Sequence, residues 1–206
     1  LSQNKEHLKG SVRFIFQPGE EGYFGAKHMI QDGCLEGVDE IYGIHLWNYQ
    51  PYGEVGVKPG PILAAADKFI INVKGVGGHG AAPQGTVDAV VVGSHLVNSF
   101  QSIVSRNTNP IESAVVTVGK FQSGNNFNII SDTAELIGTT RAYKEEVREM
   151  IVEKMNDIIS GTEKMFGADI KMDYQKGYPP TVNADLPYKN IMSAAQKIVG
   201  ENAKEP

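Results

Sequence analysis

The sequence has one cysteine, Cys34, in 206 residues, so a disulfide within the chain is excluded. A single free thiol is typical of a reducing compartment, and we expect the protein to be cytoplasmic. No apolar run comes near the roughly 20 residues that a membrane-spanning helix needs, so no membrane is expected as a partner. A basic surface is lacking too: 19 Lys and Arg stand against 24 Asp and Glu, for a net charge of −5, which argues against nucleic acid as a partner.

Hydrophobic residues make up 41% of the chain and charged residues 21%, the composition of an ordinary globular protein rather than a disordered one. This length accommodates one large domain or two small ones. The chain begins with Leu1 rather than Met, in what reads as the middle of a helix. We therefore expect it to be part of a longer chain.

Short apolar runs separated by glycine-rich turns predict mixed α/β structure in the first third of the sequence. They predict strands at residues 12–16, 41–46 and 53–57 and a short helix at 25–30. The break Pro59-Gly60-Pro61 then separates this part from a stretch of different character.

The next hundred residues predict six elements in a definite order: strand, helix, strand, strand, helix, strand. The expected ranges are 68–74, 86–105, 114–121, 133–143, 145–166 and 168–174. This order is the split βαβ unit of ferredoxin-like domains. A last helix at 185–199 is assigned to the first domain, resumed after an insertion. The predicted domains are therefore 1–65, 66–181 and 182–206.

The motif Gly19-Glu20-Glu21-Gly22 directly follows a predicted buried strand. A glycine-flanked turn frees both carboxylates to face one cleft beyond the strand's carboxyl end. Two adjacent carboxylates repel one another unless a cation or proton intervenes, and a metal site uses both: one ligates while the other takes a proton from water. The alternative is a solvated acidic turn.

His45 follows the apolar residues 41–44, so the same topological rule brings its imidazole to the edge where Glu21 lies. Imidazole and carboxylate are normal zinc ligands. The alternative for His45 is a core histidine satisfied by backbone hydrogen bonds.

His79 lies in the glycine-rich stretch 75–83, which lacks the spacing of a dinucleotide fingerprint or a P-loop. A histidine on a tight loop can donate to a developing oxyanion, although a turn with an incidental histidine is also possible. Asn128 follows one predicted strand, and Arg141 lies near the end of another with a guanidinium suited to a carboxylate. Cys34 has no histidine partner at a recognisable spacing and is interpreted as structural.

Taken together, these stretches resemble a known family, the aminoacylase and carboxypeptidase family of dinuclear metal-dependent hydrolases. The nearest branch contains hippurate hydrolase, indole-3-acetyl-amino-acid hydrolase and N-acetyl-diaminopimelate deacetylase. The motifs are Val-Arg-Phe-Ile-Phe-Gln-Pro-Gly-Glu-Glu-Gly at 12–22, Gly-Ile-His-Leu at 43–46, Gly-Gly-His-Gly-Ala at 77–81, Asn-Ile-Ile at 128–130 and Gly-Thr-Thr-Arg at 138–141.

The resemblance implies an α/β fold: part of a mixed α/β metallohydrolase catalytic domain with an inserted ferredoxin-like (βαββαβ) lid, or dimerisation, domain. It implies Glu20 as general base and Glu21 and His45 as ligands of two divalent metal ions, which are Zn, Mn, Co or Ni. The implied substrate is a small N-acyl amino acid or dipeptide whose amide bond is cleaved.

The resemblance further implies a homodimer formed through the lid, in which His79 reaches the partner subunit's active site. Asn128 and Arg141 would hold the carboxylate end of the substrate. The family's remaining metal ligands lie upstream of the glutamate pair and far downstream, outside this sequence. Relatives carry His in place of Gln84 and Pro in place of Ser131. We expect weak or absent metal binding and no turnover from residues 1–206 alone.

A second hypothesis is a non-catalytic dimerisation or binding module that retains the lid fold. A peptidase acting on dipeptides rather than an acylase shares all of these residues, and only substrate profiling separates the two enzymes. The metal is also left open, because nitrogen and oxygen ligand sets of this kind do not select one.

Overall fold

The computed structural model describes residues 2–22, 24–48 and 50–206. The chain divides into two compact units, residues 1–43 and 44–206. None of the helices in the described ranges has both the length and the apolar composition needed to cross a membrane.

The first unit contains little regular structure. Its elements are a short 3-10 helix, η1 (Ser2–His7), and helix α1 (Gly25–Gln31), which confirms the helix expected at 25–30. The strands expected at 12–16 and 41–46 are wrong for this structure: both segments are irregular, and Phe16 and Leu46 are 85% and 88% exposed. A strand needs a hydrogen-bonded neighbour, and no described residue forms a ladder with either segment.

The second unit is built on a four-stranded sheet with two helices. Its elements are β3 (Ala65–Lys74), α2 (Ala89–Ser102), β5 (Ala114–Ser123), β7 (Thr133–Ala142), α3 (Glu145–Phe166) and β8 (Asp169–Gln175). The predicted order of elements between residues 68 and 174 is therefore confirmed. The strands lie in the order β5-β7-β3-β8, and every neighbouring pair is antiparallel.

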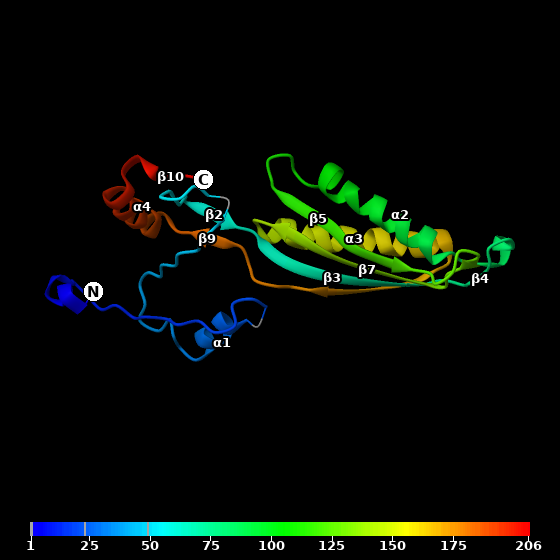
Figure 1. Cartoon of the computed structure of the whole chain (residues 1–206), viewed down its shortest axis with the longest axis horizontal. Coiled ribbons are helices and arrows are strands. Elements are labelled where there is room, and N and C mark those ends of the chain that lie inside the picture. The colour runs from blue at the N-terminus through cyan, green and yellow to red at the C-terminus, as the bar shows by residue number, and fades with distance from the viewer. Residues whose placement is uncertain (1, 23, 49) are drawn as a thin grey trace. The chain divides into compact units, whose positions relative to one another are not determined.

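Helices α2 and α3 cover one face of this sheet (Figure 1). Strand β3 alternates buried and more exposed positions, which is the two-residue period of a sheet with one covered face. Phe69, Ile71 and Val73 point from β3 into the core, and Ile151 and Met155 meet them from α3. The apolar face that predicts α3 is thus the face that packs on the sheet.

The ends of the helices follow local chemistry. At the start of α2, an Asp88 carboxylate oxygen accepts hydrogen bonds from the N–H groups of Val90 (2.8 Å) and Val91 (3.4 Å). A π-helical turn, η3 (Ile103–Asn107), continues α2, so the helix starts and ends later than the predicted 86–105. Helix α3 ends at Phe166 and is followed by Gly167, whose φ of 72° is the left-handed conformation that favours glycine.

Two short antiparallel strands connect the sheet to the rest of the second unit. They are β2 (Gly60–Leu63) and β9 (Thr181–Asn183), and Figure 1 shows them where the chain enters β3 and returns after β8. We call this pair the ribbon. Beyond it lie α4 (Asp185–Val199), which confirms the expected last helix, then η4 (Gly200–Asn202), and a parallel pair, β1 (Val55–Gly56) and β10 (Ala203–Lys204). Only two residues of the strand expected at 53–57 are regular.

Candidate active site and its surroundings

Glu20 and Glu21 lie in a tight turn directly before α1. The N–H of Gly22 donates to the Glu20 carbonyl oxygen (3.0 Å), and both glutamates are exposed. Gly19 and Gly22 have φ values of 57° and 90°, a backbone conformation that favours glycine. Gly25 is also required, because a Cβ there would lie 1.6 Å from the Pro18 carbonyl oxygen. The turn thus leaves both carboxylates accessible, as a metal or proton-transfer site requires.

His45 lies in an irregular, exposed segment at the start of the second unit. Its Nδ1 is 2.9 Å from the Leu46 carbonyl oxygen, and its ring stacks on Trp47 with centroids 4.2 Å apart. A carbonyl oxygen only accepts, so this contact places a proton on Nδ1. With its proton on Nδ1, the neutral ring carries the lone pair on Nε2, which is the tautomer of an imidazole that ligates metal through Nε2.

A carboxylate and an imidazole match divalent-metal ligands in kind, but they do not complete a set. Glu20 and Glu21 belong to one compact unit and His45 to the other. Within the described ranges, no three His, Cys, Asp or Glu side chains come together in a way that would hold a metal ion. Protein zinc sites use three or four protein ligands. The roles of Glu20, Glu21 and His45 therefore remain predictions.

His79 and Asn128 lie together at one end of the sheet. His79 is in β4 (Gly78–His79), which pairs with β6 (Ile129–Ile130), and the Gly80 N–H donates to the Asn128 carbonyl oxygen (2.8 Å). The Ala81 N–H donates to His79 Nδ1 (3.1 Å), so the neutral ring carries its proton on Nε2. Nε2 is then a hydrogen-bond donor, which is what the predicted role in oxyanion stabilisation requires.

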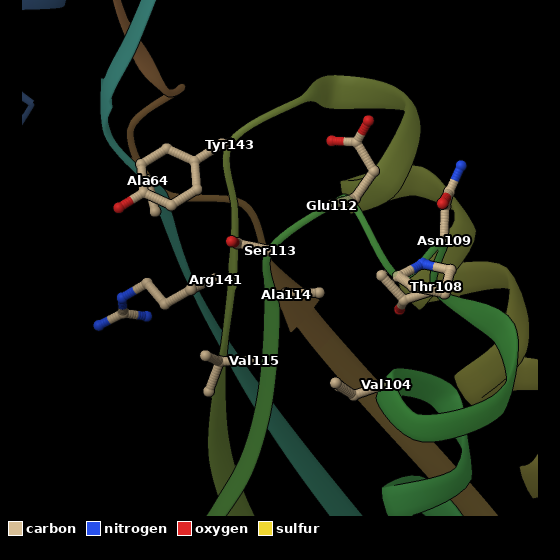
Figure 2. A pocket seen from close by; sticks show the side chains of 11 residues that line it. Ala64, Val104, Thr108, Asn109, Glu112, Ser113, Ala114, Val115, Arg141 and Tyr143 are labelled. Atoms are coloured by element: carbon tan, nitrogen blue, oxygen red, sulfur yellow. The ribbon is translucent and has the colours of Figure 1, made fainter. Parts of the chain in front are cut away.

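Arg141 lies at the other end of the same sheet. It is eight residues after Thr133, the first residue of β7, which corresponds to about 26 Å along a strand. Its Nη1 donates to the Thr140 carbonyl oxygen (2.9 Å) and to the Thr139 hydroxyl. Arg141 and Glu112 both line a pocket of about 450 Å³. Figure 2 shows the Arg141 guanidinium pointing away from Glu112. One chain does not bring Arg141 together with His79 and Asn128.

The sequence analysis missed a buried ion pair between Asp67 on β3 and Arg148 on α3. Their side chains are 1% and 6% exposed. Arg148 Nε donates to Asp67 Oδ2 (2.7 Å), and Nη2 donates to Oδ1. The Tyr174 hydroxyl also donates to Oδ2 (2.8 Å), and the Gly177 N–H to Oδ1 (2.7 Å). We call these four residues the Asp67 cluster.

The charges in the Asp67 cluster stabilise each other. Burial alone raises the pKa of Asp67, but hydrogen bonds from Arg148, Gly177 and Tyr174, together with the guanidinium charge, outweigh it and hold that pKa below its ordinary value. The pKa of Arg148 is raised, mainly by its hydrogen bonds to Asp67. Burial raises the pKa of Tyr174 as well, so Tyr174 remains a neutral donor.

A sequence signal for this pair was present. Asp67 has the same parity as Phe69 and Ile71, which places a carboxylate on the inward face of an alternating strand. Arg148 lies three residues before Ile151, on the inward face of an amphipathic helix. Two opposite charges on two faces that pack together predict a buried ion pair.

The sequence motifs predict a class, the metal-dependent hydrolases, and comparison with known proteins gives the family. The model of peptidase family M20/M25/M40 matches residues 1–206, so the chain belongs to that family. It is 46% identical over 201 residues to YhaA of Bacillus subtilis (strain 168), covering 97% of this chain and 51% of that protein. It is 38% identical over 186 residues to the N-acyl-L-amino acid amidohydrolase of Geobacillus stearothermophilus, covering 90% of this chain and 50% of that protein.

The fold also matches a solved structure, that of the Bacillus subtilis YXEP protein, described as a dinuclear metal binding peptidase from the M20 family. The TM-score is 0.75 at 31% identity, covering 95% of this chain and 49% of that chain. The resemblance stated from the motifs is thus confirmed. The chain spans about half the length of the curated relatives it matches.

Proposed function

We propose that the whole protein is a metal-dependent amidohydrolase that cleaves the amide bond of N-acyl amino acids. The observation that carries this proposal is membership of the M20/M25/M40 peptidase family over residues 1–206. Similarity to an N-acyl-L-amino acid amidohydrolase supports the acylase form, and similarity at the same identity to a carboxypeptidase keeps the peptidase form open. Two divalent metal ions, of a kind left open here, would polarise the scissile carbonyl and raise the acidity of the attacking water.

Glu20 would take the proton from the attacking water and later donate it to the leaving amine. An exposed carboxylate in a glycine-flanked turn suits that role, because it can exchange a proton without moving the backbone. Glu21 and His45 would hold metal, His45 through Nε2. The Nε2–H of His79 would donate to the oxyanion that forms as the carbonyl carbon becomes tetrahedral.

Asn128 and Arg141 would bind the substrate's carboxylate end, Arg141 through two parallel hydrogen bonds. Asn128 precedes β7, and Arg141 lies about 26 Å along β7 from Thr133, so one small substrate would contact Asn128 of one subunit and Arg141 of the other, which supports a homodimer. His79 adjoins Asn128 and would act from the same subunit as that residue.

We place the domain boundaries at the ribbon, where the chain enters and leaves the four-stranded sheet. Residues 66–181 would be a ferredoxin-like lid, or dimerisation, domain inserted into a catalytic domain formed by 1–65 and 182–206. The order of β3, α2, β5, β7, α3 and β8 supports the ferredoxin-like assignment. Pairing of β1 with β10 supports a resumed domain, because it joins strands from before and after the insertion. We propose a cytoplasmic location, and the single cysteine, which is typical of a reducing compartment, is its only support.

Substrate profiling of the full-length protein tests this function. The protein is stripped of metal, reconstituted with Zn²⁺, Mn²⁺, Co²⁺ or Ni²⁺, and given N-acetyl amino acids, N-benzoylglycine and dipeptides. The proposal predicts metal-dependent release of the free amino acid from the N-acyl substrates. Turnover of dipeptides alone would favour the peptidase form. No turnover with any metal would favour the alternative, a non-catalytic binding or dimerisation module.

A further inference from the structure

Three consecutive residues after β8 are fastened to the sheet and to α3. The Lys176 ammonium contacts the carboxylates of Glu145 (3.0 Å) and Glu149 (3.1 Å) on α3. The N–H and the carbonyl oxygen of Gly177 bind the side chains of Asp67 and Arg148. The Tyr178 carbonyl oxygen accepts a hydrogen bond from the Ala66 N–H (3.4 Å). The chain is thus held residue by residue where it leaves the sheet.

Gly177 is bound on both of its polar groups by a single ion pair. Its N–H donates to Asp67 Oδ1 (2.7 Å), and its carbonyl oxygen accepts from Arg148 Nη2 (3.2 Å). A carboxylate and a guanidinium therefore grip one residue between them, with charge-assisted hydrogen bonds on each side. Both gripping side chains are buried, so water competes little for these bonds.

No other residue type fits at position 177. A Cβ there would lie 1.9 Å from the Ala66 carbonyl oxygen, far inside van der Waals contact. The chain leaving the sheet therefore passes against the chain entering it with no room for a side chain. Directly beyond this crossing the two segments pair as the ribbon, from Leu63 and Thr181 to Gly60 and Asn183.

The ribbon is also tied at its other end. Asn183 Nδ2 donates to the Lys58 carbonyl oxygen (2.9 Å), and α4 begins two residues later, at Asp185. A two-stranded ribbon alone is a weak and flexible support. The hydrogen bonds described here hold the ribbon at its two ends, near Gly177 and at Asn183.

We propose that the Asp67–Arg148 ion pair is a clamp on Gly177 that fixes the direction in which the ribbon leaves the four-stranded sheet. Asp67, Arg148 and Gly177 are positioning residues in this device, and none of them is assigned to the chemistry. The clamp sets the orientation of the sheet and its two helices with respect to α4. A clamp on Gly177 also explains why two charges are buried between the sheet and α3, where a hydrophobic pair would pack as well.

The first experiment measures local opening with Gly177→Ala, which removes the close approach but leaves the ion pair in place. Gly161→Ala on α3 is the matched control, because a Cβ at Gly161 meets nothing within 4 Å. Trypsin cleaves after Lys176, so the rate of cutting at the bond between residues 176 and 177 reports release of the gripped segment. We expect Gly177→Ala to be cut faster than wild type by about tenfold or more, and Gly161→Ala to be cut at the wild-type rate.

Hydrogen exchange separates local opening from general unfolding. In Gly177→Ala, amide protection should fall by about tenfold or more at residues 66 and 177, while the centres of β3 and β7 keep theirs. Equal loss of protection throughout the sheet would overturn the clamp, because the cluster would then only hold the fold together. A trypsin rate unchanged from wild type would also overturn it.

Orientation is measured by spin labels at Lys171→Cys on β8 and Lys197→Cys on α4, in a Cys34→Ser background. Both lysines are exposed. The clamp predicts a narrow distance distribution in the wild type and in Gly161→Ala, and a broad one in Gly177→Ala and in Arg148→Lys, which keeps the charge but loses the fork. Equally narrow distributions in all four proteins would overturn it. None of the three readouts involves hydrolysis of an N-acyl amino acid, so failure of the clamp and failure of the proposed activity are seen separately.

Discussion

Replacing Arg148 by methionine should reverse the pH dependence of stability that Asp67 contributes. The side chains of Asp67 and Arg148 are 1% and 6% exposed, so Arg148→Met leaves a carboxylate buried without its cation. Removing one partner of such a pair destabilises a protein by about 3–5 kcal/mol at neutral pH. The Tyr174 hydroxyl and the Gly177 N–H stay near the carboxylate and reduce that cost toward the lower figure.

The sign of the pH dependence follows from the pKa of Asp67 in each protein. In the wild type this pKa lies below its ordinary value of 3.8, so the pair's stabilisation is present above that pH and is lost as the pH falls through the folded-state pKa. In Arg148→Met, burial, the largest influence on Asp67, acts without the guanidinium and against only the hydrogen bonds from Gly177 and Tyr174, so we expect the folded-state pKa to rise above its ordinary value. The variant is then least destabilised in acid and loses stability as the pH rises, by at most about 1.4 kcal/mol per pH unit.

Urea unfolding followed by circular dichroism measures this effect between about pH 4.5 and pH 7.5. Arg106→Met is the matched control, since Arg106 is exposed. The double variant Asp67→Asn/Arg148→Met removes the titrating group and should lose the pH dependence specific to Arg148→Met. A free-energy difference between Arg148→Met and wild type that stays constant across this pH range would refute the reasoning.

Three further predictions concern the core and the proposed site. Leu136→Ala, at a fully buried position of β7, should lower the free energy of unfolding by about 2–5 kcal/mol, measured by urea unfolding; a loss below about 1 kcal/mol would contradict the packing described. In the full-length protein, His79→Ala should lower kcat about 100-fold with unchanged metal content by elemental analysis, and metal loss would count against its role at the oxyanion. Arg141→Lys should raise KM about tenfold for an N-acetyl amino acid but not for its carboxamide, and equal effects on both would remove Arg141 from carboxylate binding.

Most of the fold of residues 65–175 could be predicted from the sequence, because the apolar faces that its periodicity predicts pack against one another within the chain. The face of α3 that carries Ile151 and Met155 packs against inward positions of β3, such as Phe69. In the first unit, the alternation around Phe14 and Phe16 predicts a strand equally well, but both side chains remain largely exposed. Periodicity indicates that a segment favours a strand, and a strand forms only beside a partner.

The candidate site was predictable in part and for a similar reason. The glycines around Glu20 and the loop that carries His79 have the local geometry that their motifs predict, because turns are determined by nearby residues. The separation of Arg141 from Asn128 follows from the single predicted strand between them, but the placing of His79 beside Asn128 depends on the pairing of β4 with β6, which no local pattern reveals. The Asp67–Arg148 pair joins residues 81 positions apart, so it becomes visible only when two inward faces are compared.

Metal content and turnover of the full-length protein, compared for wild type, Glu20→Gln and Glu21→Ala, test the proposed division of labour most directly. The account predicts that Glu20→Gln binds as much metal as wild type but hydrolyses no N-acyl amino acid, and that Glu21→Ala loses metal. Turnover by Glu20→Gln, or wild-type metal content in Glu21→Ala, would contradict it.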